Sequence, residues 1–184
     1  PGRADSGRVE CVDIGISPDL PGGEATGNAV LITDALVSAT LRPRGVDVHK
    51  GICGHLLVIA GSAGMTGAAY MSGVAAMRTG AGLVTIALPE SLNAVMEAKT
   101  TEVMTRPLPE ATGGRLGLAS YGAIVDALTG KTAVLIGPGL GTSDELGELL
   151  SRLIKIIDRP LLVDASGLDA ISQRLHLLKR AKRE

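Results

Sequence analysis

Three turns hold the residues of this sequence whose types and spacing could do chemistry. Residues 61–69 read GSAGMTGAA, so the hydroxyls of Ser62 and Thr66 stand beside bare glycine backbone. Residues 137–142, GPGLGT, place three glycines within five positions, and Asp164 puts a carboxylate directly after an apolar run. Glycine lets a ligand approach the backbone closely, and free amides at a helix start hold anionic groups. The turns therefore indicate contacts with an anionic ligand.

Tight packing is the alternative explanation for part of the first turn and the segment after it. The small residues that packing of a helix on a sheet would explain are Gly67, Ala68, Gly73, Ala75 and Ala76. The first turn matches neither the G-x-G-x-x-G dinucleotide fingerprint nor the P-loop, which requires a lysine after its last glycine. For Asp164, capping of a helix over residues 167–172 is an equally open alternative.

Histidines and lysines elsewhere leave their roles open. His49 and Lys50 precede an apolar strand and His55 lies beside its start, which fits either a phosphate contact or simple solvation. His176 lies in a polar run with four cations, which is typical of an exposed helix. The sequence shows no Ser-His-Asp arrangement and no metal-ligand spacing, so no metal site is expected.

The turns need strands and helices to position them, and the apolar pattern predicts both. Strands are expected at residues 9–16, 56–60, 83–87, 133–136 and 161–163, and helices at 34–41, 66–79, 91–99, 120–128 and 144–157. Residues 105–117 are expected to form a loop. Apolar strands that alternate with helices indicate an α/β fold, a doubly wound and mostly parallel sheet with helices on both faces. The first two turns should then lie side by side at the carboxyl edge of the sheet.

Composition excludes several classes of partner. Lysine and arginine number 18 against 19 aspartates and glutamates, and only two residues are aromatic, so neither a duplex-binding nor a base-stacking protein is expected. The apolar runs fall short of the ~20 residues of a membrane span. Cys11 and Cys53 lie far apart, which favours a reducing compartment and a cytoplasmic location. We therefore expect neither nucleic acid nor a membrane as partner.

Several runs of residues, taken in order, carry a resemblance to a known family. They are HKG at 49–51, GHLLVIAGS at 54–62, GMTGAA at 64–69, RTGAGLV at 78–84 and GPGLG at 137–141. Together they closely resemble the ADP- or ATP-dependent NAD(P)H-hydrate dehydratases over roughly residues 42–172. Residues 12–16, VDIGI, resemble the last strand of the NAD(P)H-hydrate epimerase domain that precedes the dehydratase in bacterial bifunctional proteins. The resemblance implies that residues 1–27 end an epimerase-like domain with its linker, and that 28–184 form the N-terminal portion of a dehydratase domain.

The resemblance also implies a ribokinase-like fold and a metabolite repair reaction. In that family a nucleotide phosphorylates the hydroxyl of the hydrated nicotinamide ring, and elimination restores NADH or NADPH. The implied substrate is NAD(P)H hydrate, the implied cosubstrate is ADP or ATP, and Mg²⁺ would offset charge on the nucleotide. The resemblance places the turn with Gly67, Ala68 and Ala69 and the turn with Gly139 and Gly141 on the hydrated-cofactor side. Asp164, the carboxylate at a strand end, is expected to join them as a substrate-binding residue.

The sequence departs from the family pattern in two places. Ser166 stands where the family usually has the second acidic residue of an Asp-Ala-Asp run. The family's Thr-Pro-His-Pro-Gly-Glu, Lys-Gly and Gly-Thr-Gly-Asp motifs, the last of which carries the expected base, do not occur before Glu184. We therefore expect the catalytic base to lie beyond Glu184, the isolated chain to be inactive, and an apolar sheet edge at residues 161–163 to favour a homo-oligomer. Two alternatives to the dehydratase function stay open, namely a ribokinase-like small-molecule kinase and a non-catalytic nucleotide-binding fragment.

Overall fold

The computed structural model describes residues 32–41 and 45–172. Packing divides the chain into two units, Pro1–Arg44 and Gly45–Glu184. In the first unit, helix α1 (Asp34–Thr40) is capped as expected, because the Thr33 hydroxyl accepts a hydrogen bond from the Leu36 amide at 3.3 Å. The strand expected at 9–16, the boundary after residue 27 and His176 lie outside the described residues.

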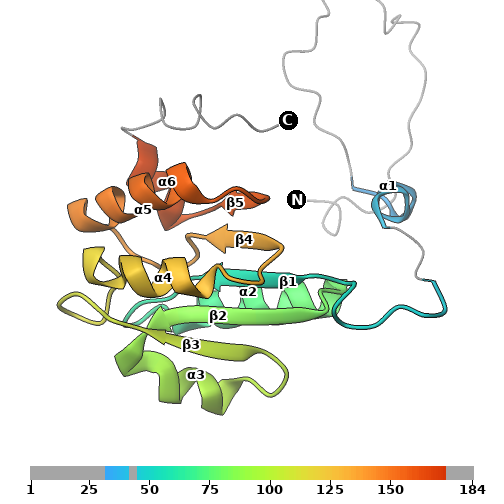
Figure 1. The fold of residues 1–184 in the computed structure, drawn as a ribbon, viewed down its shortest axis with the longest axis horizontal. Coiled ribbons are helices and arrows are strands. Elements are labelled where there is room, and N and C mark those ends of the chain that lie inside the picture. Colours follow the sequence, from blue (N-terminus) through green and yellow to red (C-terminus); the bar gives the residue numbers. More distant parts are fainter. Residues whose placement is uncertain (1–31, 42–44, 173–184) are drawn as a thin grey trace, which may run out of the picture. The chain divides into compact units, whose positions relative to one another are not determined.

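Five parallel strands form the sheet of the second unit, in the order β3-β2-β1-β4-β5 (Figure 1). The strands are β1 (His55–Ile59), β2 (Leu83–Pro89), β3 (Met104–Leu108), β4 (Ala133–Ile136) and β5 (Leu161–Val163). The chain begins at the centre of the sheet, moves outward to β3, and returns to the other side of β1 with β4. The strand order therefore reverses between β1 and β4, where doubly wound sheets bind their ligands.

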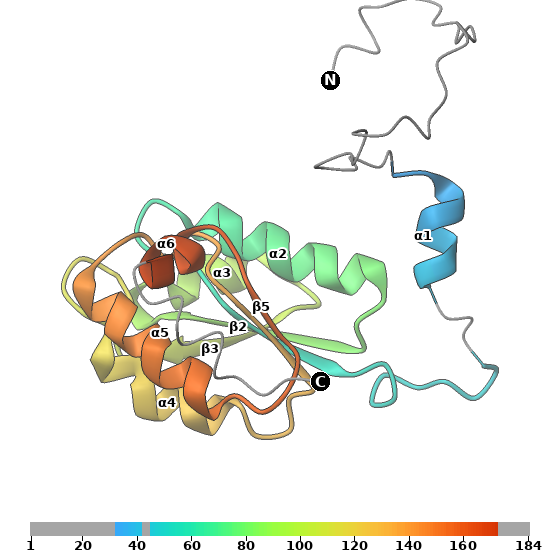
Figure 2. The ribbon, with the colours of Figure 1, turned by 90° about the horizontal axis from the view of Figure 1, so that it is seen from above.

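Helices cover both faces of this sheet, as Figure 2 shows from above. One face carries α2 (Thr66–Thr79) and α3 (Asn93–Lys99), and the other carries α4 (Tyr121–Ala127) and α5 (Asp144–Ile156). Alternate residues along β1 enter opposite cores: Leu57 and Ile59 pack with α4 and α5, whereas Val58 and Ala60, the residue directly after the strand, pack with α2 and α3. Burial on both faces explains why this strand is apolar from Leu56 to Ile59 and confirms the predicted α/β class.

The helix that follows β4 forms where its sequence predicts. The Ser143 hydroxyl accepts from the Leu146 amide at 3.1 Å, and the acidic Asp144 and Glu145 lie in the first turn of α5. Both features stabilise a helix N-terminus. Short elements complete the described fold: the 3₁₀ turns η1 (Glu90–Leu92) and η2 (Leu118–Ser120) and helix α6 (Ser166–Ile171).

The expectation of a loop from residue 105 is wrong in its first part, because β3 occupies Met104–Leu108. This strand pairs in parallel with β2 and is one of the two outer strands of the described sheet. Only Leu108 of its five residues is buried, and Arg106 and Pro107 break any apolar pattern. An edge strand tolerates proline and polar side chains, since only one of its sides must donate to a neighbour.

Candidate functional site

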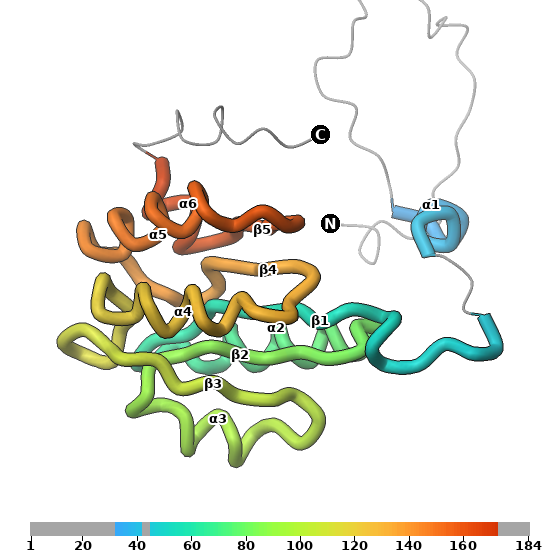
Figure 3. Tube along the Cα trace, in the orientation of Figure 1, coloured from blue at the N-terminus to red at the C-terminus, as the bar shows by residue number. Residues whose placement is uncertain are grey.

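The turns that follow β1 and β4 lie side by side at the carboxyl edge of the sheet, which confirms their predicted adjacency. The chain leaves both strands at the same end (Figure 3). The Gly61 amide donates to the Pro138 carbonyl at 2.9 Å, and the fully buried Ser62 hydroxyl donates to the Gly139 carbonyl at 2.8 Å. These bonds join the two turns into one surface at the point where the strand order reverses.

Three glycines of the second turn have positive φ: Gly137 at 135°, Gly139 at 69° and Gly141 at 74°. A Cβ on Gly137 would lie 1.8 Å from the Asp164 carbonyl oxygen, and one on Gly139 would lie 2.7 Å from the Met65 carbonyl oxygen. Any other residue would therefore force the turns apart. The close approach of the segments after β1, β4 and β5 accounts for the glycine content of this turn.

The first turn contains residues in very different surroundings. Gly67 is exposed, and a Cβ built on it would meet nothing within 4 Å. Ala68 is partly buried beside Gly139, and Ala69 is fully buried, 3.2 Å from the position of a Cβ on Gly61. Packing therefore does not explain Gly67, whereas it does place Ala69 in the core that supports the turn.

Asp164 is exposed at the carboxyl end of β5. Its amide donates to the Ile136 carbonyl at 3.0 Å, which fixes its backbone beside the end of β4. The cap position of α6 is held by Ala165, at φ 46° and ψ −126°, and no side chain caps the helix. The capping alternative for Asp164 is therefore wrong, and its carboxylate is free of that role. Ala165 has a strained backbone conformation, and residues in such conformations cluster at functional sites.

Two cations, Arg115 and Lys99, lie near the turns, and no motif around either residue in the sequence predicts this position. Residues 109–117 fold back over the sheet edge, because the Ala63 amide donates to the Gly114 carbonyl at 3.0 Å. Arg115 Nε consequently lies 3.8 Å from the position that a Cβ on Gly141 would take. Lys99 Nζ donates to Thr66 Oγ1 at 3.1 Å, at the start of α2. Tertiary folding alone brings both positive charges to the glycine-rich turns at residues 61–69 and 137–142, which we call the bare turns.

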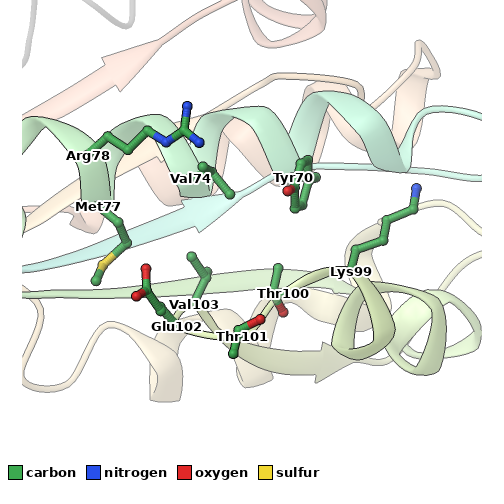
Figure 4. Close-up of a pocket in the computed structure, with 9 residues that line it drawn as sticks. All are labelled: Tyr70, Val74, Met77, Arg78, Lys99, Thr100, Thr101, Glu102 and Val103. Atoms are coloured by element: carbon green, nitrogen blue, oxygen red, sulfur yellow. The ribbon is translucent and has the colours of Figure 1, made fainter.

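A groove of about 590 Å³ runs between α2 and the segment that joins α3 to β3 (Figure 4). Its lining residues are Tyr70, Val74, Met77, Arg78, Lys99, Thr100, Thr101, Glu102 and Val103. Lys99 and Arg78 lie toward opposite ends of this lining, and the bond of Lys99 to Thr66 connects the groove with the first residue of α2. The groove is thus adjacent to the candidate site and also carries cations.

The described residues contain neither a cluster of metal ligands nor a membrane-spanning helix. Within residues 32–41 and 45–172, no group of three His, Cys, Asp or Glu side chains could hold a metal ion. No helix of the described part is long and apolar enough to cross a membrane.

Comparison with known proteins places these features in context. A family model described as NAD(P)H-hydrate dehydratase matches residues 56–184. The bifunctional NAD(P)H-hydrate repair enzyme Nnr of Moorella thermoacetica is 35% identical over 178 residues, which are 97% of this chain and 33% of that protein. The ADP-dependent (S)-NAD(P)H-hydrate dehydratase of Lactiplantibacillus plantarum is 32% identical over 78% of this chain and 49% of its own length. The chain therefore spans a third to a half of these curated relatives.

Solved structures agree with the fold. The ADP/ATP-dependent NAD(P)H-hydrate dehydratase of Bacillus subtilis, co-crystallised with ATP/Mg²⁺, is 29% identical with a TM-score of 0.59, over 74% of this chain and 46% of that one. A ribokinase-like superfamily protein of Enterococcus faecalis is 22% identical with a TM-score of 0.64, over 77% of this chain and 47% of that one. The fold is ribokinase-like, as the sequence resemblance implied.

Proposed function

Because the chain belongs to the NAD(P)H-hydrate dehydratase family, we propose that the protein containing it is an ADP- or ATP-dependent dehydratase that restores NADH or NADPH from their hydrates. The observation that carries the proposal is the pair of bare turns joined by hydrogen bonds at the reversal between β1 and β4. Such a position is where doubly wound sheets bind nucleotides. The activity is a carbon–oxygen lyase reaction, and the names of the relatives supply its substrate class.

In this proposal the hydrated dinucleotide lies against both turns. Gly67, Ala68 and Gly141 would present accessible backbone to the ligand, and Asp164 would offer a carboxylate at the same edge. Ala69 and Gly139 are buried and would act from beneath, by supporting the two turns. The open space at Gly67 lies in the first turn of α2, whose amides attract phosphate. Lys99 and Arg115 add positive charge there. The role of these residues is therefore to bind and orient the cofactor hydrate.

The cosubstrate would be ADP or ATP, which supplies the phosphoryl group when bound. The described residues fit a nucleotide through bare backbone and nearby cations, but they hold no cluster of three metal ligands. Mg²⁺ that accompanies nucleotide phosphates needs only one or two carboxylates, and Asp164 is a carboxylate at the site edge. We propose that residues outside these 184 supply the catalytic base.

The proposal extends to the domain organisation, the cellular location and the oligomeric state. Residues 1–27 would end an epimerase-like domain, and residues 28–184 would begin the dehydratase domain. The alignment of 97% of the chain with a bifunctional enzyme of Moorella supports a chain that joins parts of two domains. We propose a cytoplasmic location, which the two widely spaced cysteines support, and a homo-oligomer, which the exposed β5 edge supports.

The test is to incubate the complete protein with NADH hydrate, Mg²⁺ and either ADP or ATP while following the absorbance of the restored dihydronicotinamide. Nucleotide-dependent recovery of absorbance is expected, together with none from the 184-residue chain alone. A phosphorylated product without recovery of absorbance would instead indicate the small-molecule kinase. Binding without any product would indicate a non-catalytic nucleotide-binding protein. Turnover by the isolated chain would make Asp164 the first candidate for the base.

A further inference from the structure

A second pocket, of about 280 Å³, lies on the α4 face of the sheet. It includes His55, the first residue of β1, whereas the turn of the candidate site follows the last residue of that strand. The length of β1, about 15 Å, therefore separates this pocket from the candidate site. Neither the bare turns nor the groove beside α2 contributes to its lining.

Basic side chains converge on this pocket from three elements. Arg106 comes from β3, Lys131 from the segment between α4 and β4, and His55 from β1. Asp126 of α4 also lines the pocket, yet within the described residues no ion pair joins its carboxylate to Arg106 or Lys131. The lining consequently carries more positive than negative charge.

The basic groups of this pocket repel one another, while two hydrogen bonds fix the His55 ring and the Lys131 backbone. Burial lowers the pKa of His55 and the positive charge of Lys131 lowers it further, and burial together with Arg106 lowers the pKa of Lys131. The His55 ring is fixed by a 2.8 Å hydrogen bond between its Nε2 and Thr85 Oγ1. Arg159 donates to the Lys131 carbonyl at 2.8 Å, which holds that segment in place. An anion in the pocket would relieve the repulsion.

We propose that this pocket binds a small phosphate-class oxyanion, either inorganic phosphate or the phosphate group of a monoester. Arg106 and Lys131 supply charge-assisted hydrogen bonds, and the Thr129 hydroxyl supplies a neutral one. The pocket volume of about 280 Å³ lies just below the range of ~300–1,000 Å³ for drug-sized ligand sites, which suits a small anion and not a dinucleotide. The proposal does not depend on the dehydratase function, since no residue of the candidate site takes part.

Calorimetric titration of the complete protein with inorganic phosphate, and separately with AMP, tests this site. The pocket variant is Arg106→Gln with Lys131→Gln. The matched control is Arg152→Gln with Lys155→Gln, which removes the same charge from the exposed face of α5. We expect saturable phosphate binding whose dissociation constant rises at least about tenfold in the pocket variant and changes less than about twofold in the control.

A second readout remains valid if the pocket variant does not fold. Nuclear magnetic resonance should show that phosphate raises the pKa of His55, which faces Lys131, Arg106 and Asp126, while the exposed His49 does not respond. Binding of AMP at the same residues would identify a monoester as ligand, and binding of phosphate alone would identify the free ion. The absence of saturable binding, equal losses in the two variants, or an unresponsive His55 would each overturn the proposal.

Discussion

Gly67 and Gly73 belong to the same helix but are glycine for opposite reasons. Gly67 lies in the first turn of α2 with open space where a Cβ would stand. Gly73 faces the sheet, and a Cβ there would lie 2.7 Å from Cδ1 of the fully buried Ile86. Packing therefore requires glycine only at Gly73. The open position at Gly67 is the one that a ligand could use.

Alanine substitutions should separate these two roles by their effect on stability. Gly67→Ala should leave the free energy of unfolding unchanged or raise it by up to ~1 kcal/mol, since alanine favours helix. Gly73→Ala should lower it by about 1–3 kcal/mol, because the added methyl overpacks the core. Urea unfolding of both variants measures the difference. Equal changes in the free energy of unfolding would contradict the difference in packing between the two glycines.

The Ser62 hydroxyl joins the two turns, and its removal should lower the free energy of unfolding. Removing its hydroxyl in Ser62→Ala leaves the buried Gly139 carbonyl without that donor, which should cost about 1–3 kcal/mol of unfolding free energy. Ser151→Ala is the control, since this buried hydroxyl bonds only to Gly147 of its own helix and should cost less than ~1 kcal/mol. Denaturant titration compares them. A smaller loss at Ser62 than at Ser151 would contradict a structural link between the turns.

His55 should make stability depend on pH in a defined direction. Burial and the charge of Lys131 lower its pKa below the ordinary value of 6.5, so the unfolded chain binds a proton more readily than the folded one. The contribution of neutral His55 to the free energy of unfolding is complete above about pH 6.5, and it is lost as the pH falls through the pKa of His55 in the folded state. His55→Gln should therefore flatten the decline of unfolding free energy on acidification. An unchanged slope in the variant would remove His55 as its source.

At the scale of elements, β5 is an edge of the described sheet that exposes apolar surface. Leu162 is 63% exposed on this strand, and Ile52, in a loop, is 64% exposed. An apolar edge promotes pairing between chains, whereas lysine on an edge opposes it. Leu162→Lys should therefore reduce self-association of the 184-residue chain more than the control Ile52→Lys does. Light scattering or sedimentation at matched concentrations would show this, and equal effects would rule out the edge as the contact.

Elements differ in how much of them the sequence could predict. α5 was predictable because its buried leucines repeat with helical spacing after the Ser143 cap. β1, β4 and β5 were predictable because β4 and β5 are apolar throughout and β1 is apolar after its first residue, His55. β3 was not, since an edge strand with Arg106 and Pro107 owes its structure to pairing with β2 and carries no pattern of its own.

At the scale of the whole molecule, the same distinction applies to the candidate site. The bare turns and their adjacency followed from glycine-rich segments after parallel strands, which is local information combined with a topological rule. Arg115 and Lys99 could not be anticipated, because a folded-back loop and the end of α3 bring them to the turns from distant positions. The buried state of Ala69 likewise depends on how α2 packs against the sheet.

We propose that the complete protein is a nucleotide-dependent dehydratase whose cofactor hydrate lies against the bare turns. The most direct measurement is the rate at which wild-type, Gly67→Val and Gly122→Val proteins restore NADH from its hydrate. Gly122 is the matched control, since it is also the second residue of a helix, exposed, with nothing within 4 Å of an added Cβ. We predict that Gly67→Val raises KM for the hydrate at least about tenfold and that Gly122→Val leaves it unchanged. If the wild-type protein restored no NADH in a nucleotide-dependent way, the dehydratase function would be wrong, and equal KM values for the two variants would rule out hydrate binding at Gly67.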